Sequence, residues 1–240
     1  MKKNFICLFL VFLPFIAFSQ AISYPVANDK NVYILKNERY AVGFSDTYGV
    51  AVWSLYSYDP TMKMGISNVP EEWVTDSRIK SNRTTAKEFD SLNLYKTQMF
   101  PKEHAMTYAE VQKTTYLTSN ILPMSQSLKE NIWDRITREI EEVAQKYGRV
   151  YVYSGPVFEK EFSKNRYLIS NRVVMPVSFY RMYIYFQGGK TRYKCYKFSN
   201  HAPTDYEKKC PLDDFSYNIY KLESDTGIDF VDQSVDDLLQ

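Results

Sequence analysis

Histidine and cysteine are both scarce in this 240-residue chain, which leaves few side chains for several kinds of catalytic site. There are two histidines, His104 and His201, and three cysteines. None of these residues stands at a CxxC or CxxH spacing that would indicate a zinc site. The sequence also lacks a GxSxG nucleophile elbow and a phosphate-binding P-loop. A general base therefore has to be sought among few candidates.

Neither sign of charge predominates in the chain. It has 30 basic and 28 acidic residues, and two of the basic ones, Lys2 and Lys3, lie in an N-terminal segment that we expect to be removed. The remaining 28 of each sign balance, and a neutral protein does not favour nucleic acid as a partner. We interpret one local basic cluster as a solvated strand face: Lys190, Arg192, Lys194 and Lys197.

Long apolar runs are limited to the N-terminus. Residues from Phe5 to Ala17 are almost wholly apolar, follow two lysines, and end in the small-x-small sequence Ala17-Phe18-Ser19. A run of about 13 residues is too short to span a bilayer, which takes roughly 20. We therefore predict a cleaved signal peptide over residues 1–20 and a secreted, extracellular mature protein without a membrane span. An uncleaved anchor is the alternative.

Secretion changes what the cysteines imply. Cys7 lies in the predicted signal peptide, which leaves Cys195 and Cys210 in an oxidising environment. We expect one disulfide between them, worth on the order of 3 kcal/mol, with two free thiols or an intermolecular bridge as alternatives. The sequon Asn82-Arg83-Thr84 lies in a polar stretch, and it makes Asn82 a predicted N-glycosylation site.

The clearest helical pattern lies in the middle of the chain. Ser127 and Glu130 form a capping box, and apolar residues recur at three- and four-residue steps from Leu128 to Tyr147. Gly148 stands where a left-handed C-cap is expected. These features predict a helix over residues 127–147.

Extended segments surround that helix. We predict two strands joined by a turn over residues 31–59, a short strand over 150–153, a hairpin over 173–198 that turns at Gly188-Gly189, and a further strand over 216–220. A weaker apolar spacing indicates a helix over 105–114. The fold class is α+β: a twisted, mainly antiparallel sheet with helices packed on it, in a single domain over residues 21–240.

Two phrases around the predicted helix carry a family resemblance. Asn120, Ile121, Pro123, Leu128 and Trp133 fit N-I-x-P-Q-x-x-x-L-N-x-x-x-W, and residues 150–158 fit V-Y-V-x-x-G-P-V-F. The sequence resembles the DNA/RNA non-specific endonucleases, whose fold is called ββα-metal, over roughly residues 32–239. Met124 replaces the family Gln. A Met also replaces this Gln in the nuclease-like domain of the ectonucleotide pyrophosphatase/phosphodiesterases. The sequence resembles that domain more closely, and that domain has lost nuclease activity.

The resemblance implies where an active site would lie. An active member needs a His general base in a D-R-G-H phrase, an Asn and a Glu that support Mg²⁺, and an Arg one turn further along the helix. Counting back 22 residues from Asn120 places Gln98 at the His, and glutamine cannot take up a proton at neutral pH. Every expected catalytic or metal position departs from the pattern: Tyr95, Lys96, Thr97, Gln98, Lys129, Thr137 and Glu141.

Other residues offer little replacement chemistry. His104 is six residues beyond the required position, in what reads as a surface turn, and His201 follows the hairpin. The adjacent acids at 213–214 and 236–237 are typical of solvated surface. Residues 159–164 occupy the place of a calcium loop in the ectonucleotide family, but two lysines and a missing glycine argue against a calcium site.

The sequence therefore predicts a secreted, catalytically inactive nuclease-like module without catalytic residues, metal or other cofactor. Its partner would be an unknown protein or another extracellular ligand. One alternative is an active, Mg²⁺-dependent DNA/RNA endonuclease whose site lies elsewhere. Another is a detached accessory subunit that packs on a separately encoded phosphodiesterase domain.

Overall fold

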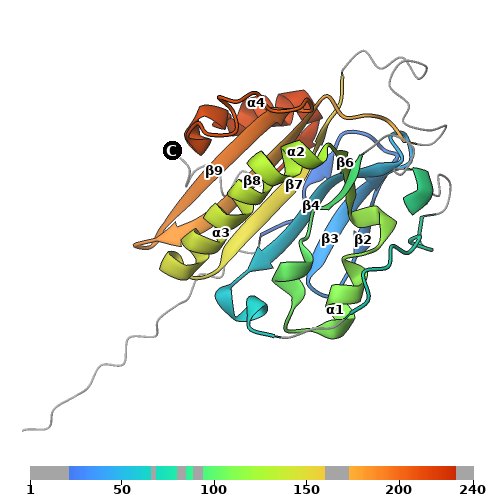
Figure 1. Cartoon of the computed structure of the whole chain (residues 1–240), viewed down its shortest axis with the longest axis horizontal. Coiled ribbons are helices and arrows are strands. Elements are labelled where there is room, and N and C mark those ends of the chain that lie inside the picture. Colours follow the sequence, from blue (N-terminus) through green and yellow to red (C-terminus); the bar gives the residue numbers. More distant parts are fainter. Residues whose placement is uncertain (1–21, 66–68, 80–84, 89–93, 160–172, 231–240) are drawn as a thin grey trace, which may run out of the picture.

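A six-stranded antiparallel sheet forms the centre of the molecule, with strand order β2-β3-β4-β7-β8-β9 (Figure 1). The structure, a computed structural model, describes residues 22–65, 69–79, 85–88, 94–159 and 173–230. The strands are β2 (Val32–Lys36), β3 (Tyr40–Ser45), β4 (Val50–Tyr58), β7 (Val150–Val157), β8 (Ser178–Gln187) and β9 (Lys190–Ser199). The predicted α+β class with a mainly antiparallel sheet is confirmed.

Side chains alternate between the two faces of this sheet, and each face covers its own core. In β8, Phe179 and Tyr183 belong to one core, whereas Tyr180 and Met182 belong to the other. Long runs of buried residues in β4, β7 and β8 follow from this burial on both faces, because neither face of these central strands is left to solvent.

One continuous helix covers the first face. It consists of α2 (Gln126–Leu128), a π-helical turn (Lys129–Trp133) and α3 (Asp134–Tyr147), and α3 lies across β7 and β8 (Figure 1). Ile136 and Ile140 on α3 are fully buried. The helix ends before Gly148 as predicted, but that glycine, with φ +87° and ψ −144°, does not have the left-handed helical conformation expected of it.

The helix begins earlier than the capping box indicates. Ser125 is the N-cap, and its hydroxyl accepts a hydrogen bond from the amide of Leu128 at 3.2 Å. The predicted N-cap at Ser127 is therefore wrong by two residues. Ser127 precedes the apolar Leu128 but lies inside α2, whereas Ser125 has the extended backbone that a cap requires.

A second, two-stranded sheet lies on the same side as α3. β5 (Tyr95–Gln98) pairs antiparallel with β6 (Ile121–Met124), and two β6 side chains enter the core beneath α3. Between these strands the chain forms a 3-10 helix (Lys102–Ala105) and α1 (Ala109–Thr114). The helix predicted over 105–114 is thus split into two short pieces.

The C-terminal part covers the second face. α4 (Ile219–Thr226) packs on it, and β10 (Ile228–Asp229) pairs with β1 (Val26–Ala27). The strand predicted over 216–220 is wrong, because Asn218 caps α4 by accepting a hydrogen bond from the amide of Lys221 at 3.0 Å. The hairpin that turns at Gly188-Gly189 is confirmed as β8 and β9.

The predicted disulfide does not form in the structure. Cys195 and Cys210 are both buried free thiols. Cys195 belongs to the core on the second face, whereas the carbonyl of Cys210 accepts a hydrogen bond from Arg135 of α3 on the first face. The sulfur of Cys210 contacts the carbonyl of Glu207 at 3.5 Å rather than Cys195, and proximity in the sequence did not indicate this.

Several predictions fall outside the described residues: the signal peptide, Asn82, most of the 159–164 stretch and the acids at 236–237. Among the helices in the described ranges, none is long and apolar enough to cross a membrane.

Candidate functional site

A cavity of about 600 Å³ collects every position at which the sequence departs from the nuclease pattern. Tyr95, Lys96, Thr97 and Gln98 reach it from β5, and the other three reach it from the long helix: Lys129, Thr137 and Glu141. The structure therefore brings together residues that lie up to 46 positions apart in the sequence.

Gln98, at the position of the expected general base, is used as a structural brace. Its Nε2 donates to the carbonyl and hydroxyl oxygens of Thr115, both at 3.0 Å, and its Oε1 accepts from the amide of Lys102 at 3.0 Å. Both ends of the amide are thus committed to neighbouring segments. The side chain has neither a basic atom nor the freedom to orient a water molecule.

Lys129 forms an ion pair where a metal-ligating side chain is expected. Its ammonium lies 2.8 and 3.1 Å from the two carboxylate oxygens of Asp134 and 5.3 Å from the ring centroid of Tyr95. The π-helical turn widens the helix by one residue, so that side chains five positions apart face each other. Sequence reasoning missed Asp134 because regular helix pairs are spaced by three or four.

Thr137, at the position of the supporting carboxylate, contacts a buried cation. Its hydroxyl donates to the carbonyl of Trp133 at 3.1 Å and accepts from the guanidinium of Arg181. Arg181 is fully buried, lies 4.5 Å from the ring of Trp133, and donates to the hydroxyl of Tyr56 at 2.9 Å. Arg181 is the one charged residue in the aromatic sequence of β8, and this isolated charge was the signal in the sequence that could have identified it.

Glu141 is held on the cavity wall by two groups. It accepts from Lys63 at 2.8 Å, and Nε2 of His104 lies 3.2 Å away. The hydrogen bond from His104 and then the one from Lys63 lower the pKa of Glu141 to about 2. This carboxylate is therefore charged at neutral pH.

His104 lies behind Glu141 and is fully buried, so the expected surface turn is wrong. Its ring stacks on Tyr58 with 3.9 Å between centroids, and burial lowers its pKa to about 4. His201 is exposed in the loop after β9, 3.6 Å from Glu207. Neither histidine lines the cavity.

A hydrated divalent ion does not fit the residues of this cavity. Within the described part of the chain, no group of three His, Cys, Asp or Glu side chains could hold a metal. Glu141 and Asp134 are each bound to a lysine ammonium. A Mg²⁺ ion needs oxygen ligands that are not already neutralised by a cation.

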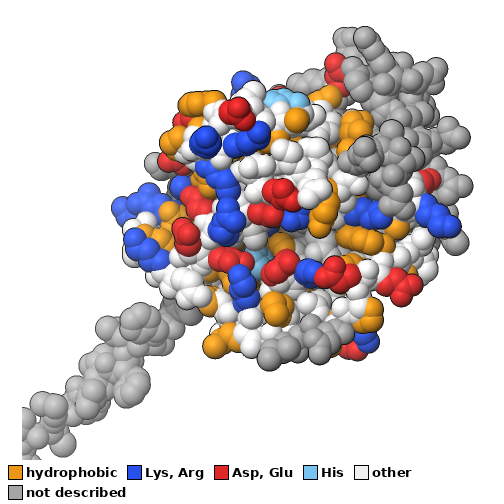
Figure 2. All heavy atoms as spheres, in the orientation of Figure 1, with side chains coloured by type: hydrophobic (Ala, Val, Ile, Leu, Met, Phe, Trp, Pro, Cys, Tyr) orange, Lys and Arg blue, Asp and Glu red, His pale blue; other side chains and the backbone are white. Residues whose placement is uncertain are grey.

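The cavity is lined by five basic and four acidic side chains, which are largely matched in pairs. Three ion pairs cross it: Lys63–Glu141, Lys102–Glu71 and Lys129–Asp134. Figure 2 shows basic and acidic side chains interspersed across this face of the molecule. The potential in the cavity is therefore close to balanced, which does not favour a polyanion.

The basic cluster singled out in the sequence is also partly neutralised. Lys194 pairs with Glu139 and Asp213, and Lys197 pairs with Asp225. Two of the four cations are thereby committed within the fold.

Asn120, the first residue of the N-I-x-P motif, does not line the cavity but joins two segments next to it. It is fully buried, its Oδ1 accepts from the amide of Phe100 at 2.9 Å, and its Nδ2 donates to the carbonyls of Phe100 and Thr115. These bonds hold the segment after β5 against the segment before β6. The conspicuous Asn of the phrase therefore serves the fold here.

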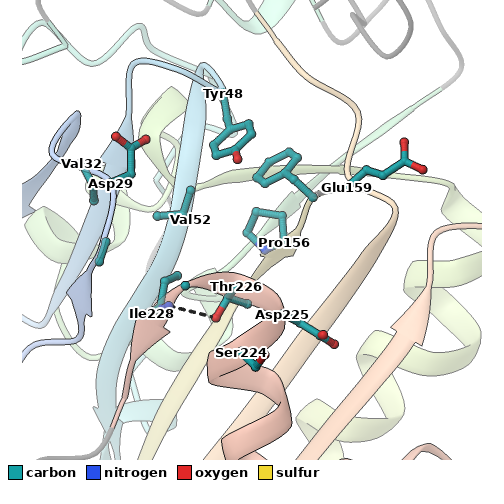
Figure 3. Close-up of a pocket in the computed structure, with 13 residues that line it drawn as sticks. Asp29, Val32, Tyr48, Val52, Pro156, Glu159, Ser224, Asp225, Thr226 and Ile228 are labelled. Atoms are coloured by element: carbon teal, nitrogen blue, oxygen red, sulfur yellow. Dashed lines mark hydrogen bonds between the residues drawn. The ribbon is translucent and has the colours of Figure 1, made fainter. Parts of the chain in front are cut away.

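A second cavity of about 250 Å³ lies on the other face of the sheet (Figure 3). Tyr48 and Phe158 stack there with 3.9 Å between ring centroids. Figure 3 shows the carboxyl groups of Glu159 and Asp225 turned away from these rings, and Asp225 pairs with Lys197. The larger cavity, whose volume lies in the range typical of ligand sites, is the candidate functional site.

Known proteins are similar to this chain in sequence and in fold. Human mitochondrial Endonuclease G is 29% identical over 136 residues, which cover 53% of this chain and 44% of that protein. The chain thus spans less than half the length of that relative. Nuclease C1 from Cunninghamella echinulata var. echinulata is 21% identical over 211 residues, covering 83% of this chain and 82% of that protein.

A solved structure supports the same fold. A chain in the crystal structure of the EndoG/EndoGI complex superposes with a TM-score of 0.74 at 16% identity, covering 86% of this chain and 88% of that one. The family model for DNA/RNA non-specific endonucleases matches residues 19–237, nearly the whole sequence. This chain belongs to the DNA/RNA non-specific endonuclease family.

Proposed function

We propose that this protein is a secreted, catalytically inactive member of its family that acts as a binding module, similar in role to the nuclease-like domain of the ectonucleotide pyrophosphatase/phosphodiesterases. The observation that carries the proposal is the bidentate ion pair between Lys129 and Asp134. A metal-centred mechanism requires an oxygen ligand at position 129, and an ammonium there repels a divalent ion.

The remaining positions of the site support the same conclusion. Gln98 is not a base, and its amide is bound at both ends. Thr137 contacts the Arg181 guanidinium. General-base catalysis contributes about 10²–10⁴-fold, and a metal stabilises phosphoryl charge by several kcal/mol more. Losing both removes on the order of 10⁵-fold or more, although such losses are not strictly additive.

Secretion is supported by the short apolar run that follows two lysines at the N-terminus. The module would bind a partner in the cavity or beside it. The cavity is formed in this fold, whereas the residues expected to be reactive in it are replaced by others.

The second candidate function is an active, metal-dependent endonuclease, and two relatives favour it, because Endonuclease G and Nuclease C1 are named as nucleases. A nicking assay separates the two. Purified mature protein is incubated with supercoiled plasmid and with RNA in Mg²⁺ or Mn²⁺, beside a mock purification. We expect no cleavage above the mock. Metal-dependent cleavage that follows the protein through two orthogonal columns would establish the second candidate instead.

A further inference from the structure

We propose that the 600 Å³ cavity binds a neutral, hydroxyl-rich ligand, namely a segment of an uncharged oligosaccharide, an inference that rests on the proposed binding function. Three features of the cavity lead to this ligand class. They are its internally paired charges, an unsatisfied buried hydroxyl, and aromatic rings at its edge.

The paired charges disfavour a charged ligand. Lys63 and Lys129 each lie 2.8 Å from a carboxylate oxygen, so an anionic ligand that contacts them is either repelled by Glu141 or Asp134 or has to displace that carboxylate. Leaving a partly buried charge without its partner is costly. A hydroxyl group avoids that cost, because it can accept from an ammonium and donate to a carboxylate at once. Hydrogen bonds to charged groups are also the stronger ones.

Thr97 points to a missing hydrogen-bond partner in the same cavity. The residue lines the cavity and is 1% exposed, and its Oγ1 has no hydrogen-bond partner among the described residues. A buried hydroxyl without a partner costs free energy, which a ligand hydroxyl would recover. The site is therefore prepared for a small polar group that both donates and accepts.

Aromatic rings supply the apolar part of the surface. Tyr95 is 43% exposed at the cavity, and Trp73 packs edge-on against Tyr116 with 5.4 Å between centroids. Large, rigid aromatic side chains that remain accessible beside polar groups are typical of binding sites. The apolar face of a sugar ring can pack on such a surface while its hydroxyls meet the ion pairs.

The test is isothermal titration of the purified mature protein with uncharged oligosaccharides: maltohexaose, cellohexaose, xylohexaose, mannohexaose and chitohexaose. Heparin hexasaccharide and a short oligothymidylate serve as anionic probes. Each titration is run at low and at high salt, because screening weakens the binding of an anion far more than that of a neutral sugar.

Two variants connect binding to the cavity. Tyr95→Ala removes the exposed ring, and Thr97→Val removes the unsatisfied hydroxyl at nearly constant shape. The matched control is Tyr220→Ala, at a tyrosine that is 48% exposed on α4. Thr97→Val should fold normally, since the hydroxyl it removes has no partner within the described structure. Circular dichroism and thermal melting verify this before titration.

We expect at least one uncharged oligosaccharide to bind with little dependence on salt. Each cavity variant should weaken that binding by about tenfold, which is the loss of about 1.4 kcal/mol, and the control should bind as the native protein does. Salt-sensitive binding of the anionic probes alone overturns the ligand class but leaves a binding module. Absence of binding by every uncharged probe at millimolar concentration also overturns it. Metal-dependent cleavage of the oligothymidylate overturns the proposed function itself.

Discussion

Nε2 of His104 lies 3.2 Å from Oε1 of Glu141, and this contact joins a fully buried imidazole to a carboxylate on the cavity wall. The imidazole is neutral at physiological pH because burial, with a smaller contribution from the nearby Arg181, lowers its pKa to about 4. Its Nδ1 has no hydrogen-bond partner among the described residues. Burial therefore favours the unprotonated imidazole, although the hydrogen bond with Glu141 raises the pKa of His104.

The burial of His104 makes stability depend on pH. In the unfolded chain His104 titrates near 6.5, so the folded state binds fewer protons, and its stability is present above pH 6.5 and lost as the pH falls towards 4. The pKa difference corresponds to about 3 kcal/mol. We expect His104→Phe to reduce the loss of unfolding free energy between pH 6.5 and pH 4, measured by urea unfolding. His201→Phe, at an exposed histidine, is the control, and equal pH dependence in all three proteins would contradict the assignment.

Divalent metals should not bind at the cavity. Because Lys129 neutralises Asp134 and Lys63 neutralises Glu141, no uncompensated carboxylate pair is left there for an ion. Titration with Mg²⁺, Mn²⁺ and Ca²⁺ should leave the melting temperature unchanged within the scatter of a buffer control. A saturable rise that a Lys129 substitution abolishes would show that this prediction is wrong.

Restoring the missing histidine alone should not restore cleavage. Gln98→His supplies a base, but Lys129 and Thr137 still leave the metal side without ligands. The same change breaks the hydrogen bonds to Thr115 and Lys102, and we expect it to cost about 1–2 kcal/mol of unfolding free energy. Gln187→His at an exposed strand end is the stability control. Plasmid nicking and urea unfolding are the measurements, and nicking above the mock level by the variant would refute the prediction.

Asn120 should be needed for stability rather than for chemistry. Asn120→Ala removes three hydrogen bonds in a fully buried place and leaves the amide and carbonyl of Phe100 without the partner that Asn120 supplies, whereas the Thr115 carbonyl keeps its bond from Gln98. We expect a loss of about 2–4 kcal/mol of unfolding free energy. The exposed Asn28→Ala should change it by less than about 0.5 kcal/mol. A loss at Asn120 no larger than at Asn28 would argue against the bracing role.

The two cysteines should be free in the native protein. The structure leaves both as buried free thiols, Cys195 in the core of the second face and Cys210 in a segment bound to Arg135 of α3. Alkylation in urea without reductant should therefore add two adducts to the intact mass of the mature chain, whereas the folded protein should react slowly. A mass that shows no adducts until a reductant is added would indicate a bridge and would require a rearrangement around Cys210.

Much of the fold could be predicted because its signals are local. Alternation and turn residues identified β8 and β9, and the apolar period identified the helix that contains α3. The seven departures from the nuclease pattern were also located by counting along two conserved-looking phrases, and the structure brings them to one cavity. The errors are equally local. Ser127 resembled a cap and residues 216–220 resembled a strand, but backbone geometry and the Asn218 cap decided otherwise.

By itself, the sequence determined the fold class and the family resemblance and predicted the loss of the expected base and metal ligands, since those follow from residue identity at positions in sequence order. Only the tertiary structure decided what replaced them. The pairing of Lys129 with Asp134 depends on a π-helical turn, and the burial of His104 and Arg181 depends on strands far away in the chain. The free state of the cysteines depends on where the strand of Cys195 and the loop of Cys210 pack in the fold. These are relations between side chains in space, and no local pattern in the sequence specifies them.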